Sequence, residues 1–187
     1  MAVMTRTPRD AKGWTVADLE HLPDDGNRYE LLDGELLVSP APTRRHQAVA
    51  FEVGKLLDAA CPQGLAVLVA PLDWQPDGRT SFQPDVLVIR NENMNARNVT
   101  DSLILAVEVL SPSTRRVDLL KKRVKYESAK VPSYWVVDPD LPSLLAFDLV
   151  EGRYQVVGKA EQDQGVELEH PFPITVRPAS LLERYNW

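Results

Sequence analysis

Two acidic residues interrupt apolar runs in the middle of the chain, where a charged side chain calls for an explanation. Asp85 precedes the apolar run 86–89, and Glu108 lies inside the apolar run 103–110. Continuous apolar runs of this length predict strands that are buried on both faces. A carboxylate in a buried strand costs several kcal/mol unless a partner compensates it. Asp85 and Glu108 are therefore candidates for chemistry.

Two such carboxylates on neighbouring strands also repel each other, and a bound divalent cation would remove both costs. Carboxylate oxygens without cysteine or histidine partners suit Mg²⁺ or Mn²⁺. The single cysteine and the three scattered histidines show no zinc-ligand spacing. The pattern indicates a Mg²⁺ or Mn²⁺ site. An alternative stays open for Glu108, which could instead pair with an arginine or lysine or lie on an edge strand.

The charge distribution is uneven along the chain. The net charge is −6, which argues against a protein coated with positive charge for nucleic acid. Residues 113–130, however, hold seven basic and two acidic side chains, a local charge of +5 that leaves −11 for the rest. Such a stretch is typical of either a local polyanion site or a solvated helix face.

The elements that must position these residues follow from apolar periodicity and turn residues. Asp33-Gly34 between apolar runs predicts a hairpin over 29–38. Helices are predicted over 14–22 with Thr15 as N-cap, 43–60, 111–130 and 180–185. Strands are predicted over 65–69, 84–89, 103–110, 134–137, 144–149, 154–157, 166–168 and 174–176. This order predicts an α/β fold with a mixed central β-sheet flanked by helices.

The helix predicted over 111–130 carries two lysines of interest. Val117, Leu120 and Val124 form its apolar stripe and predict its buried face, which Lys121 and Lys122 flank. Asp118 and Lys122 are spaced as an i,i+4 pair, which on an exposed helix contributes only about 0.3–0.5 kcal/mol. The pair is therefore either such a surface ion pair or part of a reactive site.

Length and composition suit one globular domain over 14–187, preceded by a flexible lead over 1–13. No apolar run approaches the roughly 20 residues that a membrane span needs, so no membrane association is expected. No secretory signal is visible, and the lone Cys61 fits a reducing compartment, so a cytoplasmic location is expected.

The order of short motifs adds information that single residues do not carry. These motifs are YELLDGEL at 29–36, His46, PD at 84–85, EVLSPS at 108–113, Asp118 with Lys122 and Tyr126, and YWVVDP at 134–139. In order and spacing they resemble the Uma2 family of predicted bacterial endonucleases, within the PD-(D/E)XK superfamily, over roughly residues 14–155. The chain departs from the superfamily pattern at Leu110, where a lysine is usual. Lys130 and Ser133 stand where the family usually has Gly and Glu.

The resemblance implies a restriction-endonuclease-like core with an extra N-terminal hairpin and C-terminal strands. It also implies a metal-dependent endonuclease acting on DNA. By resemblance, Asp85, Glu108 and the backbone carbonyl of Val109 would be metal ligands, and Glu30 would complete the metal shell. Lys122 would act on the attacking water or on the phosphate, with Lys121 as the alternative lysine.

Contacts to nucleic acid are expected from basic and polar residues near these motifs, and a homodimer is compatible with the superfamily. The expected residues are Arg44, Arg45, His46, Arg115, Arg116, Arg123 and Tyr126. His46 has the alternative of a packed, hydrogen-bonded residue, and Tyr126 that of a support for Lys122.

Two other classes of function stay open. One is a nuclease fold that has lost its chemistry and serves as a nucleic-acid-binding or oligomeric interaction module. The other is a metal-independent hydrolase that uses two carboxylates as acid and base. The low aromatic content of 7% disfavours a sugar cleft.

Overall fold

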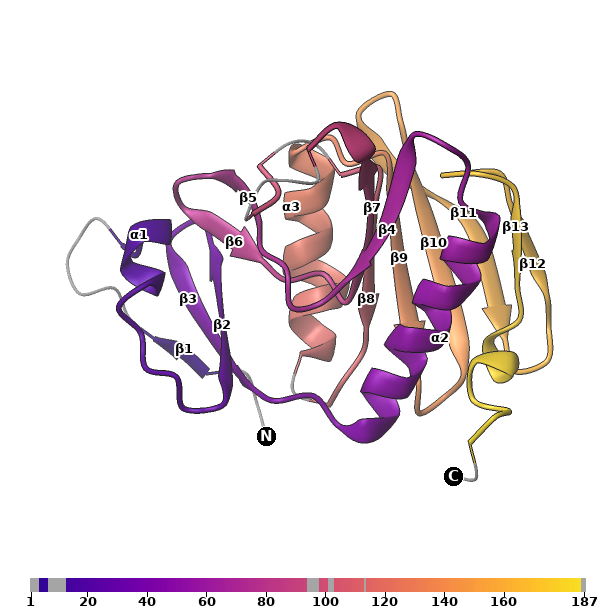
Figure 1. The fold of residues 1–187 in the computed structure, drawn as a ribbon, viewed down its shortest axis with the longest axis horizontal. Helices are drawn as coiled ribbons and strands as arrows, with labels where there is room; N and C mark the ends of the chain where they lie inside the picture. Colours follow the sequence, from indigo (N-terminus) through magenta and orange to yellow (C-terminus); the bar gives the residue numbers. More distant parts are fainter. Residues whose placement is uncertain (1–3, 7–12, 94–97, 101–102, 113, 186–187) are drawn as a thin grey trace.

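The computed structural model describes residues 4–6, 13–93, 98–100, 103–112 and 114–185. Within these residues the strands form a six-stranded, a five-stranded and a two-stranded sheet (Figure 1). None of the described helices has the length and apolar character that crossing a membrane requires. The predicted α/β class with a mixed sheet is confirmed.

The six-stranded sheet is the centre of the fold, in the order β11-β10-β9-β8-β7-β4. Strands β8 and β9 are parallel and the other neighbouring pairs are antiparallel. A parallel pair needs a long crossover connection, and the segment between β8 and β9 supplies it with a helix. The bounds are β4 Leu65–Val69, β7 Val86–Arg90, β8 Leu105–Val109, β9 Ser133–Asp138, β10 Ser143–Val150 and β11 Arg153–Glu161.

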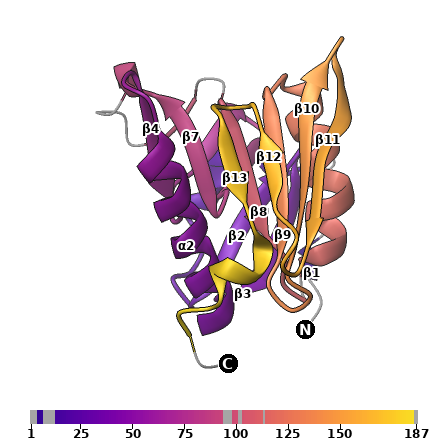
Figure 2. The same cartoon turned by 90° about the vertical axis from the view of Figure 1, so that its right-hand side faces the viewer.

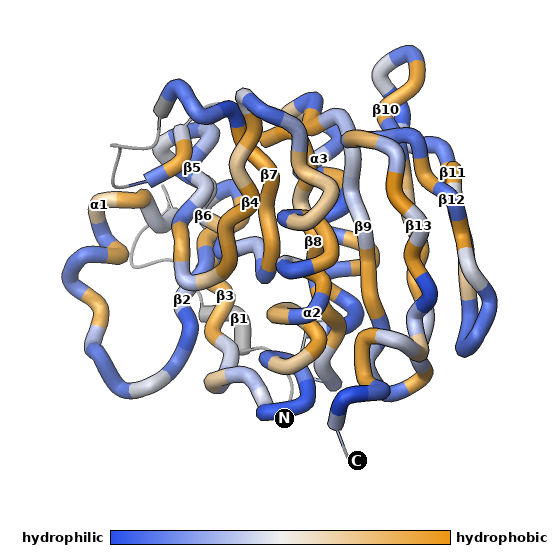
Figure 3. The backbone as a smooth tube through the Cα atoms, turned by 45° about the vertical axis from the view of Figure 1, so that its right-hand side comes forward, coloured by the Kyte–Doolittle hydropathy of each residue, from blue (hydrophilic) through white to orange (hydrophobic). Residues whose placement is uncertain are grey.

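Helices cover both faces of this sheet (Figure 2). Helix α2, Arg44–Ala60, begins after the N-cap Thr43 and buries Val49, Val53 and Leu57 against one face. The opposite face is covered by the π-helical segment η2, Val117–Lys122, which continues into α3, Arg123–Ser128. The strands between them are mostly apolar, as the orange trace of β4 and β7 indicates (Figure 3).

Strand alternation decides where the two acidic residues point. Val86 pairs with Val107 across β7 and β8, and both belong to the core beside α2. Continuing this antiparallel register by one pair sets Asp85 opposite Glu108. Since successive side chains alternate between faces, both carboxylates lie on the face that η2 and α3 cover.

The five-stranded sheet has the order β1-β3-β2-β6-β5 and lies beside the η2–α3 face (Figure 1). Its hairpin β2–β3 turns at Asp33 and Gly34, whose φ angles of 48° and 87° explain why this dipeptide predicted the turn. The bounds are β1 Met4–Arg6, β2 Asn27–Leu32, β3 Glu35–Pro40, β5 Trp74–Asp77 and β6 Thr80–Phe82.

Strands β5 and β6 were missed because they are short and polar, and Pro76 lies inside β5. Met4–Arg6, part of the predicted N-terminal lead, pair with β3, while residues 1–3 and 7–12 lie outside the described residues. The predicted first helix is present as α1, Val16–Leu19, where the backbone N–H of the N-cap Thr15 donates to Asp18.

Two predictions about helices are wrong. Leu120 and Val124 are 50% and 60% exposed, so they do not form the buried face. The buried face carries Asp118, Lys122 and Tyr126, because the polar groups of these side chains find partners inside the protein. The predicted apolar stripe also assumed regular α-helical turns, whereas the π-helical segment places its side chains differently around the axis.

The predicted C-terminal helix over 180–185 is also wrong. The chain forms a 3₁₀ turn, η3, over Pro178–Leu181, and the N–H groups of Leu182 and Tyr185 bond three residues back. The other short elements are η1 Asn91–Asn93, β12 Val166–Leu168 and β13 Ile174–Val176. The last two match their predicted bounds.

Candidate active site

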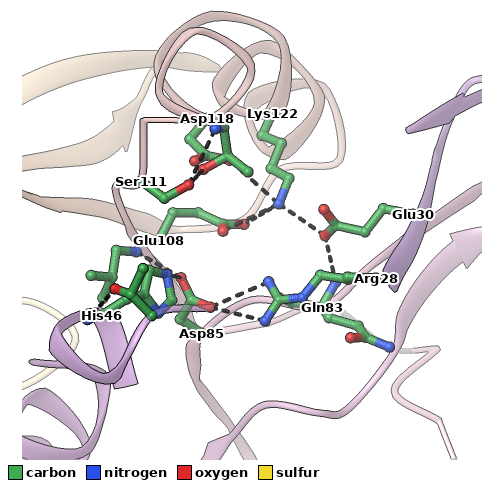
Figure 4. A network of polar contacts seen from close by, with 12 residues as sticks. Arg28, Glu30, His46, Gln83, Asp85, Glu108, Ser111, Asp118 and Lys122 are labelled. Carbon is green, nitrogen blue, oxygen red and sulfur yellow. Dashed lines mark hydrogen bonds and ion pairs between the residues drawn. The ribbon is translucent and has the colours of Figure 1, made fainter. Parts of the chain in front are cut away.

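Four carboxylates from separate segments meet between the two larger sheets (Figure 4). Glu30 comes from β2, Asp85 precedes β7, Glu108 lies on β8 and Asp118 on η2. Each is at most 3% exposed. Buried carboxylates require compensation by positive charge or hydrogen bonds, so the groups around them decide what this cluster does.

Lys122 lies among three of these carboxylates. Its ammonium donates to Glu30 Oε1 at 2.9 Å and to the two oxygens of Glu108 at 3.1 and 3.2 Å. Asp118 Oδ1 lies 3.5 Å from the same ammonium, and Lys122 is only 1% exposed. The interpretation of Asp118 and Lys122 as a surface ion pair is therefore wrong, and Lys122 is the lysine that reaches the cluster.

Asp85 is held by a separate set of donors. Its Oδ2 accepts from the backbone N–H of Val109 at 2.8 Å and lies 3.2 Å from His46 Nε2. Its Oδ1 lies 3.3 Å from the guanidinium of Arg28. Arg28 was missed in the sequence. The signal that would have found it is strand alternation, because Arg28 lies two residues before Glu30 on β2 and shares its face.

The pKa values reflect a surplus of buried negative charge. Burial, together with repulsion from the other carboxylates, raises the pKa of Glu108 well above its usual range. Burial likewise raises the pKa of Asp118 to about 6, although Lys122 opposes the shift. Burial disfavours the charged form of Lys122, but the surrounding carboxylates outweigh it and raise the pKa of that ammonium.

The pKa of Asp85 shifts in the opposite direction to those of Glu108 and Asp118. Burial favours its neutral form, but the hydrogen bond and charge of His46, followed by the charge of Arg28, outweigh this effect and lower the pKa of Asp85. Asp85 therefore stays ionised, while Glu108 and Asp118 are pushed towards protonation. This is the behaviour expected of a carboxylate that remains available to a cation.

Further groups hold the carboxylates in place. The hydroxyl of Tyr126 donates to Glu108 Oε1 at 2.8 Å, and the backbone N–H of Gln83 donates to Glu30 Oε1 at 2.9 Å. The ring of Tyr126 stacks on Trp74 with centroids 5.1 Å apart. Tyr126 is fully buried, so it supports the site rather than presenting a surface for nucleic acid.

A pocket of about 190 Å³ opens onto three of the four carboxylates, and Glu30 lies behind Lys122 without lining it. Its floor includes Asp85, Glu108, Asp118 and Lys122, and Val109 also contributes. Its walls come from β2, from the end of β3 through the start of α2, and from the segment after β8. The lining residues of these walls are Arg28, Ser39, Pro40, Ala41, Pro42, Thr43, His46, Ser111, Pro112 and Thr114.

The predicted arginines differ in their positions. Arg45 Nε donates to the backbone carbonyl of Pro139 at 2.9 Å, and Arg115 pairs with Asp138, so both contact the β9–β10 turn. Arg44 and Arg116 are exposed and adjoin Arg45 and Arg115 in sequence. The guanidinium of Arg123 instead lies over the ring of Phe147 on β10, and Arg123 does not line the pocket.

Comparison with known proteins gives the family. A profile of the Uma2 family, described as "Putative restriction endonuclease", matches residues 16–180. The chain belongs to the Uma2 family. The fold is similar to the crystal structure of a "putative nuclease belonging to DUF820" from Anabaena variabilis, with a TM-score of 0.67, 18% identity, and 93% of this chain and 94% of that chain covered. A search of curated proteins gave no match.

The donor set of this Uma2 chain fits a hard divalent cation. Four carboxylates face two permanent cations, Arg28 and Lys122, with His46 charged only when protonated. Asp118 Oδ1 is buried and accepts no hydrogen bond. No group of three or more acidic, histidine or cysteine side chains in the described residues is arranged around a common metal position. Two carboxylates and a backbone carbonyl, together with water molecules, would suffice to hold such a cation.

Proposed function

We propose that this Uma2 chain is a divalent-metal-dependent endonuclease that hydrolyses phosphodiester bonds in DNA. The observation that carries the proposal is the surplus of buried carboxylate charge at the floor of a pocket that a phosphate can enter. A structural ion-pair cluster would be expected to balance its own charges. A surplus of negative charge instead favours a cation supplied from solution.

Asp85, Glu108 and the backbone carbonyl of Val109 would hold Mg²⁺ or Mn²⁺, with Glu30 completing the shell. When bound, the cation polarises the phosphodiester and lowers the pKa of bound water. The support for Asp85 is its lowered pKa, which keeps an ionised oxygen at the pocket floor. Tyr126 and Gln83 would keep Glu108 and Glu30 oriented.

Lys122 would act as a fixed positive charge. The raised pKa of its ammonium keeps the proton on Nζ at neutral pH, so Lys122 is unsuited to removing a proton from water. Its position in the pocket lining instead suits neutralising charge on the phosphoryl oxygens and orienting the attacking water. This refines the predicted role of Lys122, in which orientation and proton removal were both open.

Arginines beside the pocket walls would hold the sugar–phosphate backbone. Arg44 and Arg45 follow the lining residue Thr43, and Arg115 and Arg116 follow the lining residue Thr114. Contacts of this kind carry little sequence information and weaken as salt rises. Arg123 is engaged on Phe147 and is left out of this role. The homodimer remains a prediction, and light scattering of the purified protein would test it.

The decisive experiment measures cleavage of supercoiled plasmid and labelled oligonucleotides in Mg²⁺, Mn²⁺ or EDTA. The wild-type protein is compared with Asp85→Asn, which removes a ligand charge but keeps the side-chain shape. Asp163→Asn, at an exposed carboxylate that pairs with Arg177, is the matched control. Cleavage that needs metal, persists in Asp163→Asn and disappears in Asp85→Asn supports the proposal.

Other outcomes of this experiment would favour a different explanation. Equal cleavage by Asp85→Asn identifies a contaminating nuclease, and cleavage of substrate in EDTA favours a metal-independent hydrolase. Absence of both cleavage and metal binding favours the interaction module. One observation supports that alternative: Arg28 contacts Asp85, and Lys122 contacts Glu30, Glu108 and Asp118, so protein cations reach all four carboxylates. Isothermal titration with Mn²⁺ separates that case from an enzyme lacking its preferred substrate.

A further inference from the structure

The depth of the site restricts the nucleic acid that can reach it. The side chains of the proposed ligands Glu30, Asp85 and Glu108 are exposed by 3, 3 and 1% respectively, so they lie below the protein surface. The phosphodiester to be cut must therefore enter the pocket. This requirement applies to the substrate and depends on the endonuclease function proposed above.

The pocket is small, and its walls contain prolines that restrict the backbone. Its volume of about 190 Å³ is below the roughly 300–1,000 Å³ of usual small-molecule sites. Pro40 and Pro42 lie in one wall and Pro112 in the other, and the ring of proline fixes φ. The pocket therefore admits one phosphodiester with the adjoining sugar, and its walls have limited freedom to widen.

A B-form duplex cannot readily meet this requirement. Its two backbones are joined by base pairs, and its persistence length of about 150 base pairs makes sharp local bending costly. An unpaired strand has free backbone torsions and can turn a single phosphodiester inwards, as in enzymes that act on extruded or single-stranded nucleotides.

The chemistry of the walls matches a backbone rather than a base. Ser39, Thr43, Ser111 and Thr114 line the pocket, and residues of these types can bond to phosphate and sugar oxygens. Among the described residues, the lining contains no Phe, Tyr or Trp side chain on which a base could stack. The imidazole of His46 also lines the pocket, but it is buried and pairs with Asp85. Recognition of the strand would therefore depend on its flexibility and charge, with little preference for sequence.

We infer that the substrate is an unpaired strand, in single-stranded DNA or at unpaired stretches of a duplex. Its phosphodiester enters through the mouth between residues 39–43 on one side and Ser111, Pro112 and Thr114 on the other. The pocket discriminates against continuous duplex by its depth and narrowness. Cleavage in a partly paired substrate falls within the unpaired stretch.

The test compares one labelled sequence as a single strand, as a full duplex and as a duplex with a central unpaired loop. Rates are measured under single-turnover conditions in Mn²⁺, with Asp85→Asn as the background. The single strand is expected to be cut at least about tenfold faster than the duplex, because the duplex must first open. Cuts in the third substrate are expected inside its loop.

A mouth variant gives an independent test. Ala41 is exposed and lines the pocket, so Ala41→Trp narrows the mouth without disturbing the core. Its matched control is Ala60→Trp, at the exposed far end of α2, roughly 24 Å from its start. Ala41→Trp is expected to lose at least about tenfold in single-strand cleavage at unchanged thermal stability, while Ala60→Trp keeps the wild-type rate.

The outcomes separate this inference from the function on which it rests. Equal or faster cleavage of the full duplex overturns the inference and leaves the endonuclease intact. Wild-type rates in Ala41→Trp likewise overturn entry through this mouth. Cleavage of none of the three substrates overturns the inference, and it overturns the endonuclease as well when the protein also fails to bind Mn²⁺.

Discussion

Two sets of ion pairs connect the helical segment η2–α3 to the hairpin β2–β3, and they differ in burial. In the inner set, Lys122 contacts Glu30 and is 1% exposed. In the outer set, Lys121 pairs with Glu35, and these side chains are 44 and 40% exposed. Adjacent lysines thus join the same two elements under different electrostatic conditions.

The comparison teaches that sequence neighbours of the same type can have separate roles. An exposed pair is screened by water and contributes little to stability. A buried pair depends on every partner, because removing one leaves a charge without compensation. The inner set belongs to the candidate active site, whereas the outer set is a surface contact between the helix and the hairpin.

The largest expected effect is on stability and follows removal of the inner lysine. Lys122→Met leaves Glu30, Glu108 and Asp118 without their shared cation, and it should lower the free energy of unfolding by about 3–5 kcal/mol. Urea denaturation in EDTA measures the change. A loss under about 1 kcal/mol would mean that the inner carboxylates are already neutral or hydrated.

The second expected effect is a gain in stability when metal binds. It should depend on the buried carboxylates and not on the exposed ion pairs. At a free Mn²⁺ concentration of 100 times Kd, the wild-type protein should gain about 2.7 kcal/mol. For a chain of this size, each kcal/mol of added stability raises Tm by about 2–4 °C. Asp85→Asn should abolish the shift, and EDTA should reverse it. Asp77→Asn, in an outer ion pair with Lys125, is the control and should retain it.

A third, smaller effect concerns pH. The folded-state pKa of Asp118 is raised to about 6 from 3.8, so the folded state holds this proton more tightly than the unfolded state. Its stabilising contribution is present below about pH 4 and is lost as pH rises through about 6. Asp118→Asn in EDTA should therefore be more stable than the wild type at pH 8.

The same variant should match the wild type below about pH 4. Thermal unfolding across this pH range measures the difference. A variant that is less stable at pH 8 would mean that the ion pair between Asp118 and Lys122 outweighs the cost of burying the carboxylate.

The smallest effect is expected in the outer set. Lys121→Met should change the free energy of unfolding by no more than about 0.5 kcal/mol, because its pair with Glu35 is solvated. Nuclease rates should match the wild type under the same conditions. A loss of activity comparable to that of Lys122→Met would contradict the separation of the two sets.

Local sequence patterns predicted much of the fold. Asp33-Gly34 has positive φ at both positions, and Thr43 caps α2, as residues of these types favour. The strands of the central sheet could be predicted from the sequence, because a continuous apolar run in a domain of this size can adopt few structures other than a buried strand. Strands β5 and β6 were not visible, because their stability comes from pairing in the sheet rather than from their own residues.

The candidate site was predicted in part. Asp85 and Glu108 stood out because each interrupts an apolar run, and their neighbourhood follows from the β7–β8 register. Arg28 was missed because its contact with Asp85 spans separate segments that only folding brings together. The burial of Lys122 was missed because the apolar stripe predicted a different inner face.

The sequence by itself determined the strands of the central sheet, the hairpin β2–β3, helix α2, the family and the unusual acidic residues, because these depend on local geometry and motif order. Only the tertiary structure decided which lysine enters the cluster, which carboxylates share it and how deep they lie. The physical reason is that charge compensation depends on distance and burial. Lys121 and Lys122 are neighbours in the chain, yet packing against Glu30 and Glu108 withdraws one from water and leaves the other in it.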